Sequence, residues 1–139
     1  MKLFREQHKK LFFGLSVLST LTLGLLSGQT EASTATATFT VTVTCTNTTP
    51  YNVGLNAGTA TAATVSTRAM TGPSSATLSY GLFQDAAYTT NWGNTVGTDT
   101  KTGTGNGSAQ ALTVYGQIPA GQYPAPGTYT DTITATITY

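Results

Sequence analysis

Charged and catalytic side chains are scarce in this chain of 139 residues. It has six basic residues, five acidic residues and a single histidine, His8. That histidine, both glutamates and four of the basic residues lie within the first 32 positions, so residues 33–139 contain neither glutamate nor histidine. A Ser/His/Asp or Cys/His triad is therefore impossible in that part of the chain. Its three acids, Asp85, Asp99 and Asp131, are scattered along the sequence, and we expect no enzymatic activity.

Cysteine occurs once, at Cys45. Because there is no second thiol, we expect no intramolecular disulfide. Exported proteins usually hold cysteines in pairs, so a single one indicates an intermolecular bond, a free thiol or a small buried hydrophobe. One cysteine and three aspartates also offer too few ligand types for a zinc site, and we expect neither a metal nor a cofactor.

Tryptophan also occurs once, at Trp92. Together with Tyr88 and Tyr123 it is a candidate platform on which a sugar ring stacks. A lone tryptophan in a β-sandwich is more often a core or corner residue, and we favour that interpretation.

The N-terminal segment has the order of a secretory signal peptide. Its basic residues are Lys2, Arg5, Lys9 and Lys10. An apolar run from Leu11 to Leu26 follows them, and small residues follow that run. This layout predicts a signal peptide over residues 1–32, cleaved after Ala32. The alternative, a membrane anchor, is disfavoured because the run is shorter than the ~20 residues that span a bilayer.

Residues 33–139 are enough for one domain. The basic residues Arg68 and Lys101 against three aspartates give this part a net charge of −1. Nucleic acids and anionic membranes both attract basic surfaces, so we expect neither as a partner. Contact with a membrane is expected only through the signal peptide, and the product is expected to be exported to the cell surface or secreted.

Threonine is the abundant residue, with 29 of the 107 residues in this part. It holds every even position from Thr34 to Thr46, and again from Thr128 to Tyr139. The odd positions are mostly apolar. Because side chains alternate between the two faces of a strand, each segment predicts a strand with one hydroxylated face and one buried face.

Weaker alternation predicts further strands at Tyr51–Leu55, Val65–Met70, Ala76–Leu82 and Leu112–Gly116. Turn residues separate them at Asn47–Pro50, Thr71–Pro73 and Pro119–Gly127. The Gly/Thr-rich segment Gly97–Ser108 is interpreted as a long loop or a flexible hairpin. Helical periodicity is weak throughout, so the pattern predicts an all-β sandwich.

The predicted final strand ends the sequence, and no later segment is available to pair with its free edge. An unpaired edge is an aggregation hazard or a docking site. We therefore expect the two threonine-rich strands to form a strand-exchange interface with another subunit. Its candidate residues are the inward positions Phe39, Val41, Val43, Tyr129, Ile133, Ala135, Ile137 and Tyr139.

Three separated segments resemble a known family. They are VTVTCTNTTPYNVGLNAG (Val41–Gly58), ATLSYGLFQDAAYTTNWG (Ala76–Gly93) and LTVYGQIPAGQYPAPGTYTDTITATITY (Leu112–Tyr139). From about Thr38 onward the chain is similar to the spore coat protein U domain family, which includes the subunits of archaic chaperone–usher pili. The run Pro126–Asp131 is the most specific part of the match.

The resemblance implies an incomplete immunoglobulin-like β-sandwich lacking its last strand. In that family a periplasmic chaperone lends a strand to the open groove, and an outer-membrane usher exchanges it for the N-terminal extension of the next subunit. The resemblance also implies a structural role without an active site. Family members carry a disulfide, and Cys45 lies where its second cysteine falls.

The sequence departs from the family pattern before Phe39. Family members usually have some tens of residues there, which supply the donor extension, the first strand and the partner cysteine. Here only Ser33–Thr38 remains, which is too short for a donor strand. Either Thr34–Thr44 is itself the donor, or the protein is shortened and accepts a strand without giving one.

These observations support one main hypothesis and two alternatives. The main hypothesis is a structural subunit of a secreted pilus, with a chaperone, an usher and other pilus subunits as partners. The first alternative is a spore coat or outer-layer structural protein. The second is a carbohydrate-binding adhesin module that uses Trp92 and the neighbouring tyrosines.

Overall fold

The computed structural model describes residues 10–11 and 34–139, and these residues form strands joined by turns. The only helical element among them is a single 3-10 turn, Pro73–Ser75. The strands are β1 Lys10–Leu11, β2 Ala35–Thr44, β3 Pro50–Leu55, β4 Arg68–Thr71, β5 Thr77–Phe83, β6 Lys101–Thr104, β7 Ala109–Ile118 and β8 Ala135–Thr138.

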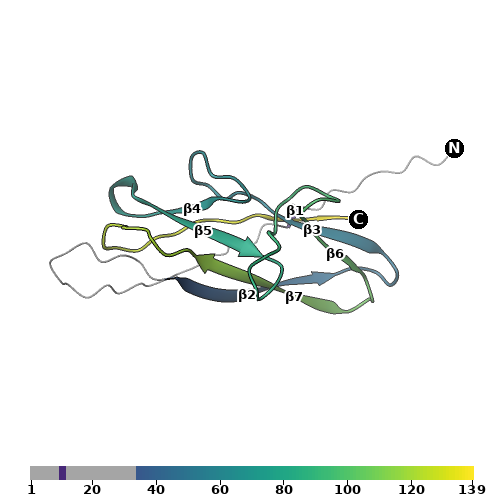
Figure 1. Cartoon of the computed structure of the whole chain (residues 1–139). Helices are drawn as coiled ribbons and strands as arrows, with labels where there is room; N and C mark the ends of the chain where they lie inside the picture. Colours follow the sequence, from purple (N-terminus) through teal and green to yellow (C-terminus); the bar gives the residue numbers. More distant parts are fainter. Residues whose placement is uncertain (1–9, 12–33) are drawn as a thin grey trace.

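The strands form two four-stranded sheets (Figure 1). One sheet has the order β1-β8-β3-β6, and the other has the order β2-β7-β5-β4. All described pairings within them are antiparallel. Residues of both sheets meet in one hydrophobic core. The predicted all-β sandwich is therefore confirmed.

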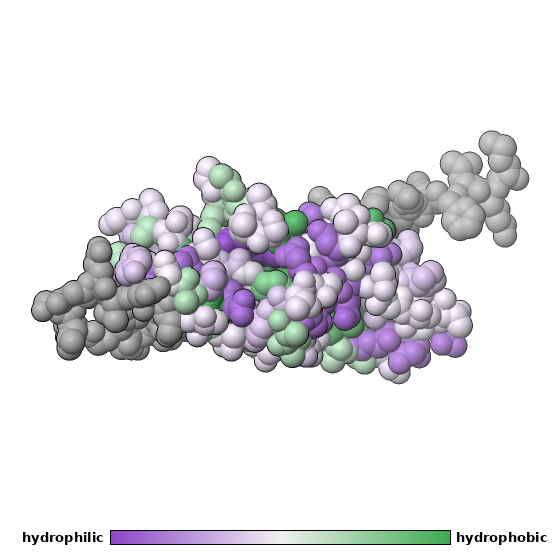
Figure 2. Space-filling view, viewed as in Figure 1, coloured by the Kyte–Doolittle hydropathy of each residue, from purple (hydrophilic) through white to green (hydrophobic). Residues whose placement is uncertain are grey.

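Strand β2 follows the threonine pattern closely. It pairs with β7 along its whole length, from Ala35 opposite Ile118 to Thr44 opposite Ala109. Its even-numbered threonines are all exposed, whereas Val43 on the other face is buried. Figure 2 shows mostly pale colours over the described surface, as expected where threonine, serine and glycine replace charged residues.

The C-terminal segment keeps the predicted alternation but is not one continuous strand. Thr130 forms a bridge to Thr71 at the edge of β4, whereas β8 begins only at Ala135 and pairs with β3 in the other sheet. The chain therefore changes sheets between these points, and its odd positions stay inward. Tyr129, Asp131 and Ile133 are buried in this crossing.

The second edge of β8 is not free along its whole length, contrary to the sequence prediction. Thr136 pairs with Lys10 and Ala135 pairs with Leu11. These two partners belong to the predicted signal peptide, and the rest of that prediction lies outside the described residues. The pairing shows that the edge of β8 accepts an antiparallel strand.

Strand β6 lies inside the Gly/Thr-rich segment Gly97–Ser108, for which the sequence predicts a long loop or a flexible hairpin. It pairs with β3 from Thr104 opposite Pro50 to Lys101 opposite Val53. Gly103 packs on the ring of Tyr51, where an added Cβ would lie 2.8 Å from Cε2 of that ring. The glycine that weakens the local strand signal thus makes room for a core tyrosine from the neighbouring strand.

Candidate functional site

The apolar inner face of the β2-β7-β5-β4 sheet is buried at β5 and uncovered at β2. On β5, Leu78 and Leu82 are 3% and 1% exposed. On β2, Phe39 and Val41 are only half-buried, and Ala37 is exposed. These residues belong to one face of one sheet, so the opposite layer of the sandwich covers β5 and leaves part of β2 open.

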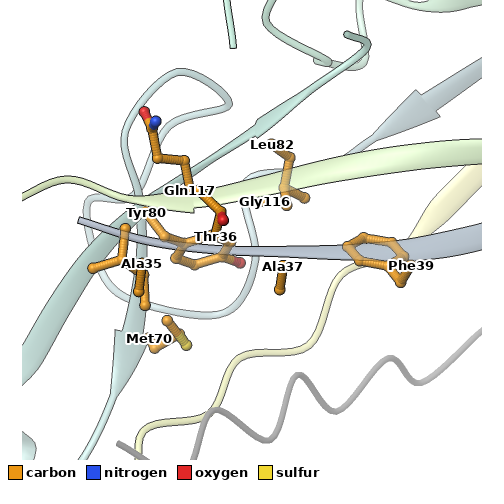
Figure 3. A pocket seen from close by; sticks show the side chains of 10 residues that line it. Ala35, Thr36, Ala37, Phe39, Met70, Tyr80, Leu82, Gly116 and Gln117 are labelled. Atoms are coloured by element: carbon orange, nitrogen blue, oxygen red, sulfur yellow. The ribbon is translucent and has the colours of Figure 1, made fainter. Parts of the chain in front are cut away.

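A hollow marks the uncovered region (Figure 3). Its volume is about 60 Å³, and its inward-facing lining comes from all four strands of the sheet. The apolar lining residues include Ala35, Ala37, Phe39, Met70, Leu82 and Ile118. Gly116 lies opposite Ala37 in the β2–β7 register, so small residues leave the space that a side chain from another strand would fill.

The hollow borders the outer edge of the sheet. Strand β2 has ten residues and pairs with β7 on one side; on its other side, the described part of the chain supplies no partner. The strand carries neither charge nor proline, and these are the features with which proteins usually protect an exposed edge. An apolar face and an unprotected edge therefore lie together.

The structure divides the sequence-predicted interface residues between the two layers. Phe39, Val41 and Val43 lie on the inner face of β2, and among the predicted residues only Phe39 lines the hollow. Four others are in or next to the core: Tyr129, Ile133 and Ala135 are buried, and Ile137 is half-buried. Tyr139 is 53% exposed.

Sequence reasoning did not identify the small residues that form the hollow. Ala35, Ala37 and Gly116 have no chemical signature of their own, and their importance follows from the β2–β7 register. The only available signal was that the inward positions of the first threonine-rich segment begin with alanines rather than with large apolar residues.

A buried cation holds three segments of the sandwich together. Arg68 is fully buried, and its guanidinium donates hydrogen bonds to four backbone carbonyl oxygens. The acceptors are Leu55 (2.9 Å), Asn56 (2.8 Å), Val65 (2.6 Å) and Trp92 (2.7 Å). Burial lowers the pKa of Arg68, and the nearby Tyr80 and Asp131 partly oppose that shift.

A buried carboxylate fixes the crossing of the C-terminal segment. Asp131 accepts hydrogen bonds from the Tyr80 hydroxyl (2.7 Å), the Thr59 N–H (2.8 Å) and the Thr59 hydroxyl (2.9 Å). Gly58 lies against it with φ +88°, a conformation that favours glycine. Burial, and then the hydrogen bond to Asp131, raise the pKa of Tyr80 far above its usual value, so the hydroxyl stays a donor.

We expect Tyr80→Phe to lower the free energy of unfolding by about 1–3 kcal/mol, because it removes a hydrogen bond to a buried charged group. Urea unfolding of residues 33–139 measures the change. Tyr115→Phe is the control, since Tyr115 is half-buried on the outer face of the same sheet. Equal free energies of unfolding for the two variants would contradict a stabilising role for the hydrogen bond between Tyr80 and Asp131.

A second aspartate organises the turn after β5. Asp85 accepts hydrogen bonds from the N–H groups of Ala87 (3.0 Å), Thr89 (3.2 Å) and Thr90 (2.7 Å). Partial desolvation raises the pKa of Asp85, but the bonds from Thr90 and Thr89 outweigh this effect and lower it to about 2. The turn places Tyr88 at φ +58°, in the left-handed region.

The lowered pKa predicts how the turn responds to acid. The ionised carboxylate stabilises the turn above the unfolded-state pKa of about 3.9, and this stabilisation is lost as the pH falls through about 2. Asp85→Asn should therefore lower the thermal midpoint at pH 7 and have a much smaller effect below pH 2. A difference of the same size at both pH values would contradict this assignment.

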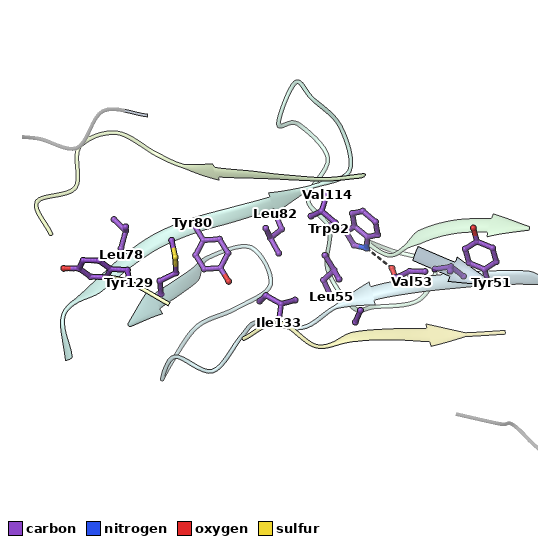
Figure 4. Close-up of a cluster of buried hydrophobic side chains, with 13 residues drawn as sticks. Tyr51, Val53, Leu55, Leu78, Tyr80, Leu82, Trp92, Val114, Tyr129 and Ile133 are labelled. Atoms are coloured by element: carbon purple, nitrogen blue, oxygen red, sulfur yellow. Dashed lines mark hydrogen bonds between the residues drawn. The ribbon is translucent and has the colours of Figure 1, made fainter. Parts of the chain in front are cut away.

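Trp92 is a core residue and not a sugar platform (Figure 4). It is 0% exposed, and its indole N–H donates a hydrogen bond of 2.8 Å to the carbonyl oxygen of Val53. A ligand cannot stack on it in this fold. The favoured interpretation from the sequence is confirmed, and the adhesin alternative that relied on Trp92 is wrong.

Cys45 follows the end of β2 and is half-buried with a free thiol. We expect a maleimide reagent to label it completely in denaturant, because the chain has no second cysteine. Intact mass before and after reduction measures this. Labelling that requires a reductant would instead reveal a disulfide between two chains.

The sequence profile described as the Spore Coat Protein U domain matches residues 9–136. The chain belongs to the Spore Coat Protein U domain family. The family match begins well before Thr38, where the sequence resemblance was placed, and so includes residues of the predicted signal peptide.

The chain is also similar to a curated protein, Protein U of Myxococcus xanthus. It is 45% identical over 62 residues, which make up 45% of this chain and 34% of that protein. The match thus spans about a third of the relative's length. In the described ranges, 10–11 and 34–139, no helix is long and apolar enough to cross a membrane.

Proposed function

We propose that the chain is a structural, non-enzymatic subunit of a secreted surface fibre, a pilus, assembled by donor-strand complementation. In this proposal the sandwich is an incomplete immunoglobulin-like domain, and another polypeptide supplies the missing strand. A periplasmic chaperone supplies it first, and an outer-membrane usher then exchanges it for a strand of a neighbouring subunit. Membership of the Spore Coat Protein U domain family and the relative Protein U support a surface structural protein.

The observation that carries the proposal is the open apolar face beside the unpaired edge of β2. Half of its residues direct their backbone groups away from β7. An added strand would form about five hydrogen bonds, each contributing ~1 kcal/mol net. Covering three or four apolar side chains contributes roughly 1.5–3 kcal/mol for each. This gain is similar to the ~5–15 kcal/mol stability of a small domain, so the lone subunit is expected to be marginal.

The pairing of β2 also indicates which segment of the protein could act as the donor strand. Thr34–Thr44 was one candidate donor from the sequence. In the structure, Ala35–Thr44 pairs with β7 at every residue and forms part of the receiving sheet. We therefore propose that the donor strand comes from a different segment or a different chain.

A pair of neighbouring substitutions tests the proposal in cells that export the protein. Ala37→Asp places a charge on the uncovered inner face, whereas Thr38→Asp places the same charge on the exposed outer face. We expect electron micrographs to show surface filaments with the wild type and with Thr38→Asp, and none with Ala37→Asp. Filaments that form normally with Ala37→Asp would refute strand addition at this face.

A second candidate function is an outer-layer structural protein, and the family description, which names a spore coat, favours it. The same strand addition would then link subunits within a shell. Immunogold labelling separates the two candidates. Labelled filaments extending from the cell support the pilus, and a continuous labelled layer without filaments supports the coat.

A further inference from the structure

The β2-β7-β5-β4 sheet carries a second hollow, and Tyr80 and Gln117 line both this hollow and the first. Its volume is about 270 Å³, close to the lower end of the ~300–1,000 Å³ range of small-molecule sites. Its lining includes Ser66, Thr67, Ser79, Gly81, Phe83 and Gln117. Ser79, Gly81 and Phe83 alternate with the buried inner residues of β5, which places them on the outer face.

An aromatic ring forms one wall of this hollow. The Phe83 ring packs over Gly81, where an added Cβ would lie 2.6 Å from Cε2 of the ring. Phe83 is half-buried and stands opposite Tyr115 in the β5–β7 register. The side chain is therefore partly open to solvent, and the electron-rich faces of aromatic rings attract polarised C–H groups.

The turn after β5 braces that ring. Tyr88 contacts Phe83 edge to face, with the ring centroids 5.7 Å apart and an interplanar angle of 89°. Tyr88 has φ +58°, a conformation that is uncommon for a bulky residue. The Asp85 carboxylate and the hydrogen bond from Gln84 N–H to the Thr90 carbonyl (2.9 Å) hold it there. Backbone strain maintained in this way often accompanies a functional site.

The polar groups of the hollow are uncharged. Hydroxyl groups come from Ser66, Thr67 and Ser79, and an amide comes from Gln117. Among the described residues, the Gln117 side chain has no hydrogen-bond partner, so both of its polar atoms are available to a ligand. An aromatic wall with neutral donors and acceptors fits a ligand that has C–H faces and hydroxyl groups but no charge.

We propose that this outer hollow binds a neutral carbohydrate. A sugar ring stacks on Phe83, the Gln117 amide hydrogen-bonds to its hydroxyl groups, and Tyr88 acts as a positioning residue for the Phe83 ring. This binding goes beyond the assembly role.

The test uses the purified chain and biotinylated neutral hexasaccharides of glucose, mannose or galactose, with binding measured by biolayer interferometry. We expect at least one of them to bind, and Phe83→Leu and Gln117→Ala each to weaken that binding at least tenfold. Tyr123→Leu is the matched control, because Tyr123 is 59% exposed and does not line the hollow. It should bind like the wild type.

Two substitutions of Tyr88 test whether it positions the Phe83 ring for sugar binding. Tyr88→Ala should weaken binding, and Tyr88→Phe should restore it, because phenylalanine keeps the edge-to-face contact and lacks only the hydroxyl. The proposal is overturned if none of the hexasaccharides binds, or if a folded Gln117→Ala chain binds as tightly as the wild type. The second outcome decides the question even if Phe83→Leu fails to fold.

Discussion

Replacing Arg68 by methionine is expected to abolish cooperative folding of residues 33–139. The substitution keeps a long side chain but removes the donors to the carbonyls of Leu55, Asn56, Val65 and Trp92. Each buried acceptor left without a donor costs about 1–3 kcal/mol. The total approaches the ~5–15 kcal/mol that stabilises a domain of this size. Circular dichroism during thermal unfolding measures the loss.

Lys101→Met is the matched control for this experiment. It removes the same charge from a half-buried position on β6, and we expect a cooperative transition close to that of the wild type. Arg68→Lys should be intermediate, since an ammonium group lacks the fork of donors that reaches several carbonyls. An Arg68→Met chain that unfolds cooperatively within a few degrees of the wild type would show that the guanidinium network is dispensable.

Supplying the missing strand covalently is expected to give the largest gain in stability. A flexible linker after Tyr139 would carry a ten-residue strand that alternates threonine and valine. If it pairs with β2 and covers Phe39 and Val41, a net gain of about 3 kcal/mol raises the thermal midpoint by roughly 10–20 °C. Differential scanning calorimetry of the fused and unfused chains measures the shift.

The control for the fusion is a strand of the same composition with its valines grouped in pairs. Such a strand cannot place all its apolar side chains on one face, and we expect it to raise the midpoint by only a few degrees. Equal stabilisation by both fusions would mean that the tether, and not strand pairing, stabilises the domain.

The threonine-rich strands were the part of the fold that the sequence predicted best. Strand β2 and the inward positions Tyr129, Asp131 and Ile133 follow the two-residue period, because β-branched side chains on one face and apolar ones on the other dictate which face is buried. The break before β8 was not predictable. It depends on Thr71 and Asn56 in distant segments, which bind the backbone at Thr130 and Thr134.

Two features of the candidate sites were also invisible in the sequence. The sequence shows Arg68 only as one of two basic residues in the net charge, because its hydrogen-bond partners are backbone carbonyl groups, which every residue carries. The hollow beside β2 depends on Ala35, Ala37 and Gly116, and small residues signal a cavity only when the register and the opposite layer are known. Both features depend on which distant segments of the chain pack against each other, and the sequence alone does not give this.

Donor-strand complementation requires that a strand from another chain pairs with the edge of β2 and covers its inner face. Hydrogen–deuterium exchange of residues 33–139, with and without the fused alternating strand, tests it most directly. We predict that residues 35–44 exchange much faster than residues 77–83 in the unfused chain, and that the fusion slows exchange in 35–44 at least tenfold. Equal protection of the two segments in the unfused chain, unchanged by the fusion, would contradict the claim.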